Sequence, residues 1–209
     1  MKYVLPLILF IPLFCISQNT LEKQMDSITT TEAATEFLKV NKPEDGKVYT
    51  YNKEKHKTKL ANALFKLSIG DKKVFKTNFK KTFYKVINKT EVDHCKFNII
   101  VLDGKDTSNQ SAKIIRNKVL SQYNEGYKFM ELAKLHSSSP TANMGGDTGW
   151  IKLGEISEAF DKEAFNKERA INEVFTIDDL EHKKYYIVIK TQDKKPIEEI
   201  TVLKFTEDI

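Results

Sequence analysis

Residues 129–150 read FMELAKLHSSSPTANMGGDTGW, and the two halves of this segment differ in character. In the first half, Phe129, Leu132 and Ala133 fall on one face of a helix. The second half is polar and contains the pair Gly145-Gly146, which permits backbone angles closed to residues with a Cβ. Trp150 then opens a new apolar segment. We therefore expect a helix, a polar loop, a glycine turn and the start of a strand.

The segments around this stretch alternate between strand and helix patterns. Near the end of residues 91–103, both odd and even positions are apolar, so both faces of a strand there would be buried. This pattern predicts a central strand. Ser157 is predicted to be the N-cap of a short helix that buries Phe160. The other expected elements are a helix over 112–123, strand-like residues at 151–156, strands at 174–176 and 185–190, and an edge strand at 200–205.

The helix, the polar loop and the Gly-Gly-Asp-x-Gly turn before an aromatic residue resemble the signature of the parvulin family of peptidyl-prolyl cis-trans isomerases. The resemblance covers about residues 92–191. It implies an α+β fold, parvulin-like or FKBP-like, with a four-stranded antiparallel or mixed sheet and flanking helices. It also implies isomerase (rotamase) activity on proline-containing polypeptides.

The chain begins with a pattern typical of a secretory signal peptide. Lys2 precedes an apolar run that is too short for a membrane-spanning helix, and cleavage after Ser17 fits best. Lipidation at Cys15 is a less favoured alternative, because Phe14 stands where a small residue is expected. We therefore expect export to the periplasm, the cell envelope or the medium, and a mature chain with Cys95 as its one thiol.

Charge and pattern divide the chain into a signal peptide (1–17), a smaller, lysine-rich α+β module (18–90) and a parvulin-like domain (91–209). Residues 41–89 hold 14 lysines against 4 acidic residues, a local balance of +10 within a chain of net charge +5. Such a module could act as a chaperone arm for acidic clients or touch envelope polymers, whereas export argues against nucleic acid. A solvated lysine face is the simpler explanation. Residues 64–87 also loosely parallel 164–191, either as a decayed half-copy or by chance.

Prolyl isomerisation requires neither a nucleophile nor a metal nor another cofactor, and we expect none here. The barrier of about 18–20 kcal/mol arises from amide resonance. A dry pocket that grips the proline ring, with a few groups that favour the twisted imide, is sufficient to lower it.

The resemblance assigns seven residues to the site. Catalytic polar positions fall on Asn98, Ser139, Thr176 and Tyr186, and substrate-binding positions fall on Thr148, Ile156 and Phe160. Asn98 and Tyr186 replace the two family histidines, and Ser139 stands where Cys or Asp is usual. His94 lies about 13 Å along the same strand from Asn98, too far to replace the missing ring. His182, in residues that are inserted relative to the family, could swing inward or remain a solvated loop residue.

Three functions are compatible with this pattern. The first is an exported parvulin-type isomerase of reduced activity that assists the folding of exported proteins. The second is a non-catalytic chaperone that binds extended proline-containing segments, and the third is an assembly subunit that docks on a folded partner. The pattern favours them in this order and leaves the oligomeric state open.

Overall fold

The computed structural model describes residues 21–104 and 109–209. The expected signal peptide and Cys15 lie outside these residues. Within them, no helix is long and apolar enough to cross a membrane.

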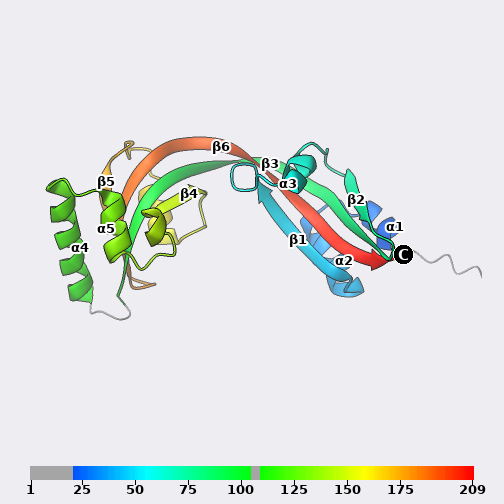
Figure 1. The fold of residues 1–209 in the computed structure, drawn as a ribbon, viewed down its shortest axis with the longest axis horizontal. Coiled ribbons are helices and arrows are strands. Elements are labelled where there is room, and N and C mark those ends of the chain that lie inside the picture. Colours follow the sequence, from blue (N-terminus) through cyan, green and yellow to red (C-terminus); the bar gives the residue numbers. More distant parts are fainter. Residues whose placement is uncertain (1–20, 105–108) are drawn as a thin grey trace, which may run out of the picture.

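Two very long strands run through both halves of the molecule. Strands β3 (Lys80–Asp103) and β6 (Lys184–Asp208) pair antiparallel from Lys80 opposite Asp208 to Asp103 opposite Lys184. They arch over the length of the protein and carry a group of shorter elements at each end (Figure 1). The sheet is therefore continuous, and each half of the molecule uses a different half of the same two strands.

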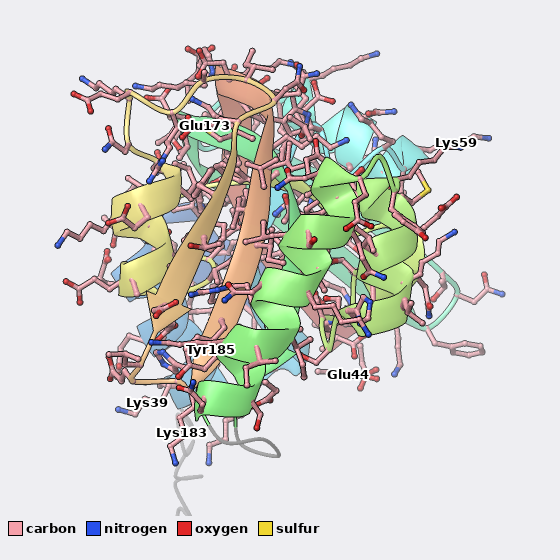
Figure 2. All side chains as sticks on the ribbon, turned by 90° about the vertical axis from the view of Figure 1, so that its left-hand side faces the viewer. Lys39, Glu44, Lys59, Glu173, Lys183 and Tyr185 are labelled. Atoms are coloured by element: carbon pink, nitrogen blue, oxygen red, sulfur yellow. The ribbon has the colours of Figure 1, made fainter. Side chains whose placement is uncertain are left out.

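The half that contains the parvulin signature has the expected α+β architecture. Its sheet order is β4 (Asp147–Ile151), β3, β6 and β5 (Val174–Asp179), with every pair antiparallel. Helices α4 (Asn109–Asn124) and α5 (Phe129–His136) pack on one face. Helix α6 (Glu158–Ala164) packs on the other face, so that β5 and β6 lie between α6 and α4 (Figure 2).

The other half has a similar set of elements. Helices α1 (Leu21–Asp26) and α2 (Thr31–Asn41) cover one face of a sheet in the order β1 (Glu44–Asn52), β6, β3, β2 (Lys72–Lys76). Helix α3 (Lys59–Phe65) lies on the opposite face. Helices α1 and α2 are separate, because the chain turns at Ser27–Thr30 and Thr30 caps α2.

Two strand predictions were wrong. Residues 200–205 are not an edge strand of the second domain but part of β6, where they pair with both β1 and β3 and pack in the first half. The strand expected at 151–156 lies earlier, as β4, and the following residues form the loop to α6. The predicted boundary between residues 90 and 91 falls inside β3, whose pairing with β6 continues through both residues.

Candidate active site

The glycine turn presses the loop after α5 against the edge of β3. Gly146 has a φ of 82°, and a Cβ there would lie 2.3 Å from the carbonyl oxygen of Ile99. The Ile99 amide donates to the Gly146 carbonyl oxygen at 2.8 Å, and the Val101 amide donates to Ser137 Oγ at 3.0 Å. These contacts explain why glycine is required at position 146. They also hold the loop between α5 and β4, residues 137–146, beside Ile99 and Val101; we call it the serine loop.

A cleft of about 290 Å³ opens where this loop, the β4–α6 loop and the two central strands meet. Its volume is small for a ligand site, and it suits one side chain of a polypeptide better than a large molecule. The lining comes from β3, the serine loop, the β4–α6 loop and β6. Its residues are Ile99, Val101, Asp103, Ser138, Ser139, Pro140, Glu155, Ile156, Lys184 and Tyr186.

Tyr186 provides the polar centre of the cleft. Burial, together with the negative charge of Asp179, raises the pKa of its phenol to about 12, against the opposing effect of a hydrogen bond with Ser157. The ring rests edge-on against Phe160, with ring centroids 5.5 Å apart. At neutral pH the hydroxyl is therefore protonated, and its position is fixed by an aromatic floor.

Behind Tyr186, a buried carboxylate organises the start of α6. Asp179 is 1% exposed and lies 3.0 Å from His182 Nδ1, and it also accepts a hydrogen bond from the His182 amide. Burial raises the pKa of Asp179, but hydrogen bonds from Ser157 and His182 outweigh this effect and hold the pKa below its ordinary value. Ser157 caps α6 by accepting from the Phe160 amide. His182 thus anchors Asp179 and does not line the cleft.

The structure brings together three of the seven predicted site residues. Ser139, Ile156 and Tyr186 line the same cleft, although they come from a loop, a second loop and a strand. Ser139 Oγ lies 2.9 Å from the hydroxyl oxygen of Thr141, which holds it in the turn. Phe160 is adjacent, but its ring is fully buried beneath Tyr186 and does not line the cleft.

The other three predicted residues face elsewhere. Asn98 lies opposite Ile189, which packs with α4 and α5, so it is on the other face of the sheet from Tyr186. Thr148 accepts a hydrogen bond from the Phe97 amide at 3.2 Å and closes the irregular step between β4 and β3. Thr176 is exposed on β5, between two buried neighbours that face α6.

Several lining residues are not among the seven predicted site residues. Val101 lies directly across from Tyr186, and Asp103 lies across from Lys184. The alternation that starts at Phe97 would have placed Ile99 and Val101 on the cleft face once Tyr186 was assigned to it. No comparable sequence signal identifies Glu155.

Replacing Tyr186 by Phe should remove an alkaline component of stability. Between pH 10 and about 12 the unfolded chain releases the phenolic proton while the folded chain keeps it, so a rising pH favours unfolding. Urea unfolding at several pH values should show a steeper loss for the wild type than for Tyr186→Phe in this window. Parallel stability curves for the two proteins would contradict the buried, protonated phenol.

A search of family models matches residues 81–195 to the PPIC-type PPIase domain, more than half of the chain. Among curated proteins, the chain is 36% identical over 64 residues to the chaperone SurA of Thiobacillus denitrificans, which covers 31% of this chain and 15% of that protein. It is 32% identical over 77 residues to the chaperone SurA of Methylobacillus flagellatus, which covers 37% and 17% respectively. The chain thus aligns with less than a fifth of the length of these relatives.

Two solved structures superpose on about half of the chain. A PpiC-type peptidyl-prolyl isomerase domain superposes with a TM-score of 0.44 at 20% identity, over 50% of this chain and 94% of that one. PrsA from Bacillus subtilis superposes with a TM-score of 0.37 at 28% identity, over 49% and 36%. The family model alone spans most of β3, the whole serine loop and the start of β6, and on that ground the chain belongs to the family of PPIC-type (parvulin) peptidyl-prolyl isomerase domains.

Proposed function

We propose that this protein is an exported parvulin-type isomerase that assists the folding of exported proteins by acting on extended, proline-containing segments. The observation that carries the proposal is the cleft at Tyr186, which lies inside the segment matched by the family model. Export is supported by the apolar N-terminal pattern of residues 1–17, and a chaperone role accords with the description of the curated relatives.

The cleft offers what the reaction needs. Ile99, Val101 and Ile156 supply an apolar wall for a proline ring. As the imide twists, its nitrogen regains a lone pair, which a hydrogen-bond donor stabilises more than it stabilises the planar ground state. The Tyr186 hydroxyl, protonated at neutral pH, is such a donor, and the neighbouring Ser139 hydroxyl can hold the flanking peptide. This chemistry involves no covalent intermediate.

The replacement of both family histidines favours a second candidate, a non-catalytic chaperone that binds the same segments. Asn98 faces away from the cleft and cannot replace a ring there, so that the polar centre is reduced to Tyr186 and the serines. The two candidates share a ligand and differ only in turnover.

Prolyl exchange in short X–Pro peptides, followed by NMR with the full mature chain, tests the proposal. We expect catalysed exchange that falls about tenfold in Tyr186→Phe, the effect of losing one hydrogen bond of ordinary net strength. Ile156→Ala should weaken peptide binding, because it shortens the apolar wall. Thr176→Ala, which changes a residue on the same sheet facing away from the cleft, should behave as the wild type.

Chemical-shift changes on peptide binding without faster prolyl exchange would select the non-catalytic chaperone. No peptide shift at all, together with stable co-purification of a folded partner, would select an assembly subunit. Equal effects of Tyr186→Phe and Thr176→Ala on exchange would remove Tyr186 from the mechanism.

A further inference from the structure

The two halves of the molecule repeat one order of elements. The first half has the order helix, helix, strand, helix, strand, strand (α1, α2, β1, α3, β2, β3). The second half has the same order (α4, α5, β4, α6, β5, β6), apart from the added 3-10 helix Ala142–Met144 before β4. The sheet orders β1-β6-β3-β2 and β4-β3-β6-β5 also correspond, with the roles of the two long strands exchanged. The N-terminal half therefore has the parvulin arrangement, and the C-terminal end of β6 serves as its first strand.

The register and burial identify equivalent residues. Tyr84 lies between two fully buried residues, Phe83 just before it and Val86 two positions after it. Tyr186 lies in the same way between Tyr185 and Val188. The partner across the sheet is Lys204 for Tyr84 and Val101 for Tyr186. Thus Tyr84 occupies in the first half the position that Tyr186 occupies in the second.

The helices that lie over these tyrosines differ at one decisive position. Thr58 Oγ1 accepts a hydrogen bond from the Ala61 amide, just as Ser157 Oγ accepts one from the Phe160 amide. Ala61 therefore stands where Phe160 closes the floor of the cleft. The first half lacks that aromatic floor, so we expect no grip on a proline ring there.

Lysines replace apolar residues around Tyr84. Lys47, Lys204, Tyr84 and Lys73 lie directly across from one another in a row over all four strands, whereas Tyr186 lies between Val101 and Ile177. Like charges on adjacent strands destabilise a sheet, and Lys47 lies opposite Lys204. An anionic partner would relieve this repulsion.

Aromatic rings flank the lysine row. Phe75 is 45% exposed and lies edge-on to Tyr84 at 5.8 Å, and the Lys73 ammonium lies 5.5 Å from its ring centroid. The Lys47 ammonium lies 5.1 Å from the ring centroid of Tyr49. Lys204 pairs with Asp45 at 3.5 Å, but in the described part of the chain no carboxylate lies within 4.0 Å of the ammonium of Lys47 or Lys73. We call this surface the lysine–tyrosine face; it comprises Lys47, Tyr49, Lys73, Phe75, Tyr84 and Lys204.

We propose that the lysine–tyrosine face is a second client-binding surface, which takes extended polypeptide segments rich in acidic and aromatic side chains and does not isomerise them. The lysines select carboxylates, and the rings offer stacking and apolar contact to an extended strand. The inference builds on the proposed function, because it adds a holding surface to the half of the molecule opposite the isomerase cleft.

Fluorescence anisotropy with a short, proline-free peptide in which Glu alternates with Phe tests this proposal. The double variant Lys47→Glu/Lys73→Glu should weaken binding by about tenfold or more and leave prolyl exchange unchanged. The matched control is Lys39→Glu/Lys76→Glu, which makes the same charge change on α2 and on the opposite side of β2. Phe75→Ser should also weaken binding, since its ring is exposed and contributes little to the core.

Equal binding by the double variant and its control would overturn the proposal. Equal affinity for a peptide of the same charge without aromatic residues would reduce the surface to a general polyanion site and overturn it as well. A wild-type dimer that only Lys47→Glu/Lys73→Glu dissociates would assign the face to a second copy of this chain. If wild-type exchange on X–Pro peptides is absent while the proline-free peptide binds as expected, the proposed function fails and this inference stands.

Discussion

Replacing Glu199 by alanine should lower the free energy of unfolding by about 1–3 kcal/mol, the cost of leaving its buried hydrogen-bond partners unsatisfied. Glu199 Oε2 accepts a hydrogen bond from Lys152 Nζ at 2.6 Å, and Oε1 accepts one from Asn52 Nδ2 at 3.0 Å. His94, which is fully buried, places Nε2 3.2 Å from Oε1. The four residues come from β6, from the residue after β4, from the end of β1 and from β3, so the cluster clamps the two halves of the molecule together.

Glu198→Ala is the matched control for this prediction. Glu198 carries the same charge on the next residue, and its side chain pairs with Lys53 and Lys89 at a partly exposed site. Its loss should cost no more than about 1 kcal/mol. Urea unfolding of both variants at neutral pH measures the difference, and equal costs would contradict a central role for the buried cluster.

The same cluster should make stability depend on acid. Burial raises the pKa of Glu199, but hydrogen bonds from Lys152 and Asn52 and the nearby positive charge outweigh this effect, and the pKa lies below its usual value of 4.5. The folded state thus keeps the carboxylate ionised at pH values where the unfolded chain binds a proton, so the contribution is present above about pH 4.5 and is lost as the pH falls further. Glu199→Gln should unfold with a shallower dependence on acid than the wild type.

No sequence pattern indicated this cluster. In the sequence, His94 stands out only as a histidine on the same strand as Asn98, about 13 Å away at about 3.3 Å per residue. Its actual partners lie 42 residues away at Asn52 and 105 residues away at Glu199, so they become neighbours only through the pairing of β1, β3 and β6. Long-range pairing of polar residues leaves no periodic trace along the chain.

The fold of the second half could be predicted because its signals are local. The helix pattern before the serine loop, the glycine turn and the Ser157 cap each depend on residues within one short segment. The continuous β3 could not be predicted in this way. Its middle, residues 88–93, is mostly polar and has no buried residue, which in a sequence is typical of a linker between domains.

The site was harder to predict than the fold, because the face of a strand depends on a single residue of register. The place of Asn98 before three apolar residues suggested a site position. Tyr186 pairs with Val101, however, and Asn98 lies three residues before Val101, so its side chain points to the opposite face of the sheet. Irregular steps in β3 near Lys96 separate its two halves and make counting along the sequence unreliable. Ser139, Ile156 and Tyr186 line one cleft, because two loops and a single strand determine their positions.

Phe160→Ala should cost about 3–5 kcal/mol of stability. This is the largest effect expected for a single truncation in the half of the molecule that contains the cleft. The ring is fully buried and lies edge-on to both Phe97, at 5.6 Å, and Tyr186, at 5.5 Å. Removal leaves a cavity under the cleft and frees Tyr186 to tilt, so that catalysed exchange should fall as well. Phe165→Ala removes a partly buried ring 5.5 Å from Phe97, away from Tyr186, and should cost less stability and spare exchange.

Phe160→Leu separates the two ways in which this ring could matter. Leucine keeps most of the buried volume, so the variant should lose only about 1–2 kcal/mol. If the ring acts as the floor that positions Tyr186, exchange should stay within about threefold of the wild type, a small change in activation free energy. If the ring instead contacts the bound proline directly, exchange in Phe160→Leu should fall as far as in Phe160→Ala when both are measured below their unfolding transitions. The buried position of the ring favours the first result, since a side chain with no exposed surface reaches a ligand only through the residues above it.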